Sequence, residues 1–233
     1  MNQSASPTSA EPWRRRLYIP NYQIGEAAKY ARLSSQTVAK WHSADGRKTL
    51  SAKPTRAAIS YMQLIEVAVV SAFRKAGLTL RHIRETREYV SKQLTAEFPF
   101  AEYRFKADGK RLVMDYQQIE GDGGKGKILR PDQAGQLAWE EVIGRLREFE
   151  YEDEGIAVKW RPRGPKSPII IDPRIAFGAP SINGTPTWVI SGREAAGETV
   201  EEIGDDFDLD EDEVRAALAF ERALVSSEGK WNA

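Results

Sequence analysis

Apolar residues recur at helical spacing through the N-terminal part of the chain. This pattern predicts a short helix over 22–31, a second over 36–42, a long one over 62–76 and another that begins after Thr79. The apolar positions are Ile24, Ala27, Ala28 and Ala31 in the first helix, Ile65, Val69, Ala72 and Phe73 in the long one, and Ile83, Val90 and Leu94 in the last. Ser34 or Ser35 can cap the second helix, because a serine oxygen accepts a free backbone N–H there. A short strand is expected over 57–61, returning from a wing.

The middle of the chain has a different pattern of apolar residues and turn signals. Two runs, 102–106 and 111–117, flank Asp108-Gly109, which is a strong short-range hairpin signal. A helix is expected over 134–149, with Leu137, Val142, Leu146 and Phe149 facing inward. Two apolar strands follow over 156–160 and 169–171, separated by a Pro-Arg-Gly-Pro turn.

The C-terminal part is again helical. Helices are expected over 200–207 and 211–224, because Thr199 with Glu202 forms a capping-box pattern and Asp210 with Glu213 resembles one. This helix pair and the pair over 22–42 are alike only in helix lengths.

Together these elements predict an α+β fold that is mainly α. We expect a disordered tail over 1–16, a winged helix-turn-helix domain over 17–95, a mixed α/β hairpin-containing segment over 96–165 and a small helical, helix-turn-helix-like domain over 166–233.

Composition narrows the classes of function. The 233 residues include no cysteine and two histidines, His42 and His82, which lie in different predicted helices. This excludes thiolate metal sites and disfavours a zinc centre, so no metal or cofactor is expected. No nucleophile arrangement or histidine-supported carboxylate centre stands out, so we expect no catalytic residues and no enzyme. No apolar run approaches a membrane span, and the first residues do not resemble a signal peptide, so a cytoplasmic protein is expected.

The charge is divided unevenly although it sums to zero. Residues 1–95 carry 16 Lys and Arg against 6 Asp and Glu, and the remaining residues carry 18 against 28. A basic N-terminal module favours nucleic acid as a partner, and the acidic remainder favours another one.

The N-terminal helix pair has the residues that reading DNA requires. A short helix, a tight turn and a polar second helix are typical of a helix-turn-helix, whose second helix lies in the major groove. Gln36 can read an adenine edge, and the neighbouring polar and basic side chains can reach bases or phosphates. The predicted DNA-binding residues are Ser35, Gln36, Thr37, Lys40, Arg47, Lys48 and Arg56.

These residues belong to a pattern that resembles the MerR-like winged helix-turn-helix regulators. The resemblance covers about 22–94 and includes Ile24-Gly25-Glu26-Ala27-Ala28, the Ser34-x-x-Thr37-Val38-x-x-Trp41 helix and the run over 77–85. It implies DNA binding and pairing. The chain departs from the family after Glu97, where strands are expected in place of a long dimerisation helix. A small helical core with a solvated basic face is the alternative.

A glycine-lysine loop over 121–127 follows a predicted strand. It has the G-x-x-x-x-G-K spacing of a phosphate-binding loop, but Ile128 stands where Ser or Thr would hold magnesium, and Pro131 follows closely. A flexible basic loop is the alternative to nucleotide binding.

The stretch over 169–221 resembles a small helical domain of unknown function that recurs in VapB-type antitoxins, beside PIN-like ribonuclease toxins. The resemblance rests on Ile171-Asp172-Pro173-Arg174 and on the runs over 197–203 and 213–221. The arginine usual in that domain's G-T-R turn is absent, since Pro186 and Thr187 follow Gly184-Thr185. The resemblance to this domain implies a toxin partner, although a capping subdomain with a solvated acidic face is the alternative.

Residues 194–233 carry 13 acidic against 3 basic side chains, so DNA phosphates would repel this helix pair and a protein-binding role is favoured. An arginine could block a PIN-like active site by pairing with its carboxylates. The candidates are Arg161, Arg163, Arg174 and Arg193. We therefore expect a homodimeric, autorepressing antitoxin that binds double-stranded operator DNA and a PIN-like toxin. The alternative is a stand-alone MerR-like regulator with an unknown effector or partner.

Overall fold

The computed structural model describes residues 12–42, 50, 58–102, 105, 140, 142–152 and 155–229. Its N-terminal elements are α1 (Pro12–Arg16), α2 (Ile24–Ala31), α3 (Ser35–Trp41), α4 (Tyr61–Lys75), α5 (Leu80–Leu94) and the 3₁₀ turn η1 (Pro99–Ala101). The later ones are β1 (Phe149–Tyr151), β2 (Ala157–Trp160), the 3₁₀ turn η2 (Ala176–Gly178), β3 (Ser181–Ile182), β4 (Thr185–Pro186), α8 (Thr187–Ala195), α9 (Val200–Phe207) and α10 (Glu211–Gly229). This confirms the coarse class, α+β and mainly α.

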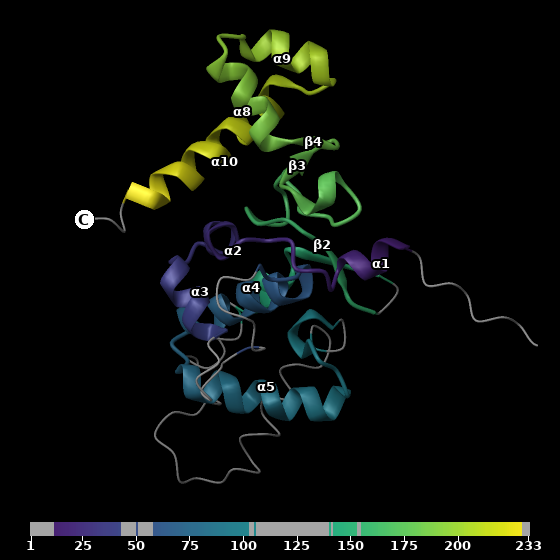
Figure 1. Ribbon diagram of the computed structural model, residues 1–233, viewed down its shortest axis with the longest axis vertical. Helices are drawn as coiled ribbons and strands as arrows, with labels where there is room; N and C mark the ends of the chain where they lie inside the picture. Colours follow the sequence, from purple (N-terminus) through teal and green to yellow (C-terminus); the bar gives the residue numbers. More distant parts are fainter. Residues whose placement is uncertain are drawn as a thin grey trace, which may run out of the picture.

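The arrangement has α4 at its centre (Figure 1). Helices α2 and α3 and strand β2 lie close to α4, whereas α5 lies at one end of the molecule and α8, α9 and α10 gather at the other. Within the described residues, no helix combines the length and the apolar character needed to cross a membrane.

Helix α4 is buried on nearly every side. The sequence pattern predicted one inward face, but twelve of the fifteen residues are buried, including Leu64, Val67 and Val70. A helix that is apolar all round has to be surrounded by other elements. Here α2, α5, η1 and β2 surround it, so α4 is the centre of the core.

A buried ion pair joins α4 to α5. Glu66 is 1% exposed, and one of its carboxylate oxygens accepts from Arg87 Nε at 2.5 Å. The other accepts from the backbone N–H of Phe100 at 3.1 Å, while Arg87 also donates to the carbonyl of Glu97 at 2.6 Å. Burial raises the pKa of Glu66, and the charge of Arg87 opposes that shift. The pair thereby holds α4, α5 and η1 together.

The prediction of a disordered tail over 1–16 is wrong for its last five residues, which form α1. Long-range contacts explain the difference. Arg14 pairs with Glu152 at 2.8 Å, and the guanidinium groups of Arg14 and Arg174 lie 5.3 and 5.2 Å from the ring centre of Trp13. Leu17, next in the chain, is fully buried.

Strands β1 and β2 form an antiparallel pair with an irregularity between Glu150 and Tyr151. The helix predicted over 134–149 therefore ends too late: Phe149 is the first residue of β1 and pairs with Trp160. Strand β2 confirms the strand predicted over 156–160, although 156 is only a bridge position. The stretch predicted as a strand over 169–171 contributes isolated bridges only, to Trp160 and Ser181. Ile59, in the strand predicted over 57–61, likewise forms one bridge, to Tyr22.

A second hairpin, β3–β4, was not predicted. Asn183 and Gly184 connect its strands with φ values of 45° and 88°. Two positive φ values in a two-residue loop define the mirror-image turn that Asn-Gly favours. The hairpin predicted at Asp108-Gly109, the strand over 111–117 and the loop over 121–127 lie outside the described residues.

Helices α8, α9 and α10 form the C-terminal helical unit. Both predicted capping patterns are present: Thr199 and Glu202 bond reciprocally at the start of α9, as do Asp210 and Glu213 at the start of α10. Helix α10 packs against α8 and also reaches back to α2, where the rings of Phe220 and Tyr30 stack at 6.3 Å.

Candidate nucleic-acid interface and partner surface

Helices α2 and α3 are joined by a tight three-residue turn. Arg32 ends α2 in the left-handed conformation with φ 57°, and the N–H of Leu33 donates to the carbonyl of Ala28 at 2.8 Å. Of the two serines proposed as caps, Ser34 is the one used: its hydroxyl accepts from the N–H of Thr37 at 3.1 Å. The turn thus fixes where α3 begins.

Burial orients α3. Val38 and Trp41 face the core, whereas Ser35, Gln36 and Lys40 are exposed and Thr37 is partly exposed. Gln36 and Lys40 are four residues apart and therefore share a helix face. The Thr37 hydroxyl bonds to that of Ser34 at 2.8 Å, so it is engaged in the cap. The structure thus brings four of the predicted DNA-binding residues together, and Arg47, Lys48 and Arg56 lie outside the described residues.

The arginines predicted to contact a toxin are separated, and most are paired internally. Arg161 donates to Glu150 at 2.9 and 3.2 Å and to the carbonyl of Ser167 at 2.7 Å. Arg174 forms a forked pair with the buried Asp172, with contacts from 2.7 to 3.2 Å, and these hydrogen bonds raise the pKa of Arg174.

Arg193 likewise bonds to Glu198 and Asp206, which ties the end of α8 to α9 and raises the pKa of Arg193.

Arg163 is different. Its guanidinium lies 4.6 Å from the ring centre of Phe220, and it makes no hydrogen bond or ion pair to any residue that the structure describes. Burial lowers the pKa of Arg163 to about 10, and repulsion from Arg32 adds to that shift.

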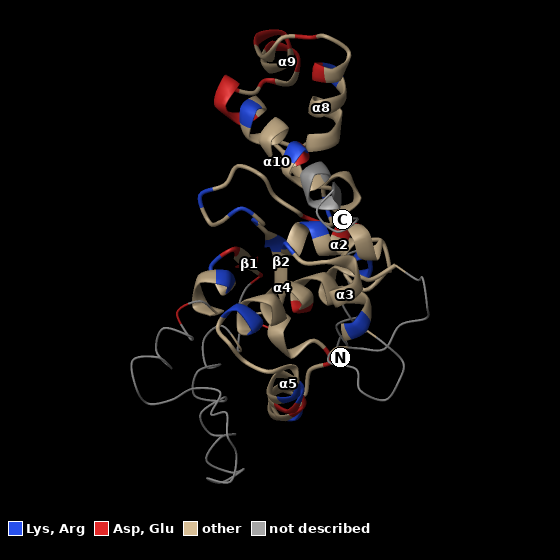
Figure 2. Ribbon diagram, turned by 90° about the vertical axis from the view of Figure 1, so that its left-hand side faces the viewer, with Lys and Arg blue, Asp and Glu red and all other residues tan. Residues whose placement is uncertain are grey.

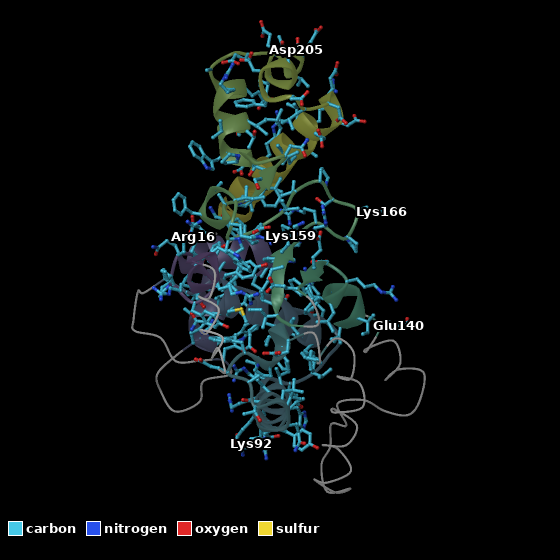
Figure 3. The ribbon with its side chains drawn as sticks, turned by 90° about the vertical axis from the view of Figure 1, so that its right-hand side faces the viewer. Arg16, Lys92, Glu140, Lys159, Lys166 and Asp205 are labelled. Carbon is cyan, nitrogen blue, oxygen red and sulfur yellow. The ribbon has the colours of Figure 1, made fainter. Side chains whose placement is uncertain are left out.

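The acidic side chains concentrate on α9 and the first turn of α10, at the far end of the molecule (Figure 2). The exposed acidic residues of this surface are Glu201, Glu202, Asp205, Asp206, Asp208, Asp210, Glu211 and Asp212. Asp205 marks this end in Figure 3, opposite Lys92 of α5. The surface carries a strong negative potential, which suits a protein partner better than DNA.

Sequence reasoning missed an exposed aromatic turn at η2. Ala176 and Phe177 have φ values of 45° and 54°, and the Phe177 side chain is 73% exposed. Two hydrogen bonds hold the turn: Asn21 donates to the carbonyl of Phe177 at 2.6 Å, and Tyr22 donates to that of Gly178 at 3.1 Å. Gly178 is the one residue of the turn whose type could have indicated it. The structure requires glycine there, because a Cβ would lie 2.1 Å from the Tyr22 hydroxyl.

Comparison with known proteins supports part of the interpretation. A family described as "Protein of unknown function (DUF433)" matches residues 169–220, from just before the bridge residues Ile170 and Ile171 to the middle of α10. The chain is 24% identical over 226 residues to a Mycobacterium tuberculosis (strain ATCC 25618 / H37Rv) protein described as "Putative antitoxin VapB45", covering 87% of this chain and 94% of that protein.

The fold is also similar to a solved structure, the X-ray crystal structure of Rv2018 from Mycobacterium tuberculosis. The TM-score is 0.73 at 24% identity, and the match covers 87% of this chain and 99% of the other. The resemblance to VapB-type antitoxins thus extends beyond the C-terminal domain from which it was inferred. The resemblance to MerR-like regulators stays an expectation from the sequence.

Proposed function

We propose that this chain is the antitoxin of a type II toxin–antitoxin system, which represses its own operon and neutralises a PIN-like ribonuclease without catalysing a reaction. The observation that carries this proposal is the similarity to a protein described as an antitoxin over nearly the whole of both chains. That extent matters because a match to 87% of this chain cannot be confined to the C-terminal helical unit.

The exposed face of α3 supports the DNA-binding part of the proposal. Gln36 and Lys40 project from a short helix whose opposite face, at Val38 and Trp41, is buried. A helix held in this way can present an amide to a base edge and an ammonium group to a phosphate. We propose that the chain acts as a homodimer, since a two-fold protein matches a two-fold operator.

The acidic helical unit supports the toxin-binding part. A ribonuclease must attract RNA phosphates, so its substrate groove is expected to be basic and complementary to α9 and α10. Of the four candidate arginines, Arg161, Arg174 and Arg193 would each have to exchange an internal carboxylate for one of the toxin, whereas Arg163 has no such pair among the described residues. Arg193 could make this exchange without leaving a fully buried carboxylate unpaired, because Glu198 and Asp206 are partly exposed, whereas Asp172, the partner of Arg174, is buried.

The deciding experiment combines two measurements. The chain is co-expressed with the product of the neighbouring gene and tested for a stable complex and for inhibition of ribonuclease activity, and a gel shift is run on its own promoter. We expect a complex that blocks cleavage and a specific shift. A neighbour that is not a PIN-like protein and does not bind would contradict the antitoxin assignment.

Alanine variants refine the toxin contact. Arg161→Ala, Arg174→Ala and Arg193→Ala are compared with Arg215→Ala, whose side chain pairs with Glu211 within α10. The arginine hypothesis is wrong if the three variants and the four-site variant that includes Arg163→Ala all neutralise the toxin as the wild type does. Thermal unfolding separates a lost contact from a lost fold, which is a specific concern at Arg174 because Asp172 is buried.

A stand-alone transcriptional regulator is the second candidate, favoured by the exposed polar face of α3 and by the MerR-like pattern over 22–94. Operator binding at full affinity without any partner protein, together with the absence of a toxin gene beside it, would favour this candidate.

A further inference from the structure

Arg163 occupies an unusual position for an arginine. It lies in the loop that follows β2, whose tip is marked by Lys166 in Figure 3, and its guanidinium is partly buried against Phe220 at 4.6 Å. Two residues earlier, Arg161 is satisfied by Glu150 and by the carbonyl of Ser167. Arg163 makes no such bond within the described residues, so its N–H donors have no acceptor there.

The surroundings of Arg163 are basic. Phe220 contacts both Arg163 and Tyr30, on whose ring it stacks, and Tyr30 is two residues before Arg32 at the α2–α3 turn. Arg32 is exposed, and its charge acts on Arg163. Arg145 also acts on Arg163, but its charge is compensated by Glu148 at 2.7 Å.

The charge of Glu148 attracts Arg163 and opposes the lowering of its pKa, but the two side chains form no ion pair. The Oε2 atom of Glu148 accepts from Arg145 and also from the indole N–H of Trp160, at 2.9 Å. Among the described residues, no carboxylate is within ion-pair distance of Arg163 or Arg32. A partly desolvated charge without a counter-ion is unfavourable, and such a group is commonly retained where a ligand supplies the opposite charge.

We propose that Arg163 and Arg32 together bind a backbone phosphate of duplex DNA, beside the N-terminus of α3. The inference rests on the proposed DNA-binding function and adds a contact from the loop after β2, far from α2 and α3 in sequence. A phosphate fits because the guanidinium fork matches two of its oxygens. The site borders the turn that leads into Gln36, where contacts to phosphates would orient the reading helix.

The test measures DNA affinity against salt concentration. Binding of a labelled duplex carrying the chain's own promoter, and of an unrelated duplex of the same length, is followed by fluorescence anisotropy for the full-length wild type and for Arg163→Met. Methionine keeps an apolar side chain against Phe220 and removes the charge. Arg161→Met is the matched control, because Arg161 is in the same loop but paired.

We expect Arg163→Met to weaken binding to both duplexes by about tenfold. The slope of log K against log salt should become shallower by about one, because one phosphate contact is lost. Arg163→Lys should restore the slope, since the charge returns, while Arg161→Met should keep the wild-type slope. The thermal midpoint of Arg163→Met should not fall, because an unpaired, partly buried charge is removed.

Three results would overturn the inference. If Gln36→Ala weakens DNA binding but Arg163→Met keeps the wild-type affinity and slope, the phosphate contact is wrong and the proposed DNA-binding function stands. If Arg163→Met binds DNA normally but fails to inhibit the toxin, Arg163 binds a toxin carboxylate. If the wild type binds neither duplex, the DNA-binding proposal itself fails and this contact fails with it.

Discussion

The helix pairs α2–α3 and α9–α10 have the same local geometry and opposite surfaces. In each pair an eight-residue helix begins with a capping box, at Glu26 or at Glu202, and ends at a left-handed residue, Arg32 or Asp208. Each turn continues through a leucine, Leu33 or Leu209, and then through an oxygen-bearing cap. The sequence predicted that the two pairs are alike only in helix lengths. The structure confirms this for α2 and α9, but α3 has 7 residues and α10 has 19, and the further likeness lies in the shared turn.

The difference between the two pairs lies in their exposed residues. The turn residue is basic in the first pair and acidic in the second, and the exposed positions that follow are Ser35 and Gln36 in one and Glu211 and Asp212 in the other. Capping and buried apolar positions specify the backbone, and neither depends on the exposed side chains. The same backbone turn can therefore serve two different partners, with charge deciding which.

The largest expected effect is on DNA affinity, which should fall on substitution in α2–α3 but not in α9–α10. Replacing Gln36 by Ala should cost about 1–3 kcal/mol of specific binding, because a base contact is lost. Asp212→Ala, at the corresponding position of α10, should leave binding unchanged or strengthen it slightly, since an acidic group is removed. Gel shifts on the promoter duplex measure both. Equal losses in the two variants would remove the distinction between the pairs.

The turn of the acidic pair should be the less tolerant of added volume. A Cβ at Gly204 would lie 2.8 Å from the carbonyl oxygen of Leu209, so the turn backbone would have to move. We expect Gly204→Ala to lower the free energy of unfolding by about 1–3 kcal/mol. The corresponding position in α2 is the buried Ala28, and Ala28→Gly should cost about 0.5–1 kcal/mol through chain entropy. Urea unfolding tests both, and a wild-type midpoint for Gly204→Ala would show that the turn is looser than described.

The two caps should contribute almost equally. Ser34 Oγ accepts from the N–H of Thr37 at 3.1 Å, and Asp210 Oδ1 accepts from that of Glu213 at 2.7 Å. Each alanine variant should lose about 1 kcal/mol, measured by thermal unfolding at a fixed pH. A much larger loss at Ser34 would mean that the serine has a role beyond the cap.

The smallest effect is a pH dependence in the acidic pair. Hydrogen bonds from Thr199, first from its backbone N–H, lower the pKa of Glu202. A carboxyl group whose pKa is lowered in the folded state stabilises it above the ordinary pKa and loses that contribution as the pH falls through the lowered value. The stability difference between wild type and Glu202→Gln should therefore be present at neutral pH and shrink at strongly acidic pH. Urea unfolding at both pH values measures it, and a difference that does not change with pH would contradict the assignment.

Local patterns in the sequence were good predictors wherever short-range physics dominates. The bounds of α9 were predicted as found, because a capping box marks its start and the apolar spacing marks its length. The exposed set Ser35, Gln36 and Lys40 followed from the same reasoning in α3. Phe149 was assigned to the wrong element because its apolar character suits a helix as well as β1, and only its pairing with Trp160 decides between them.

The sequence by itself determined the two helix pairs, the caps of α9 and α10 and the division of charge, because each depends on residues a few positions apart. It left the cap of α3 open between Ser34 and Ser35, and the structure decided for Ser34. Only the tertiary structure decided which arginines are already satisfied, that Glu66 and Arg87 join α4 to α5, and that Asn21 and Tyr22 hold the turn at Phe177. These contacts join residues far apart in the chain, where spacing carries no information. The exposed polar residues of α3 could therefore be proposed from the sequence, whereas the position of Arg163 against Phe220, which itself stacks on Tyr30 of α2, depended on tertiary packing.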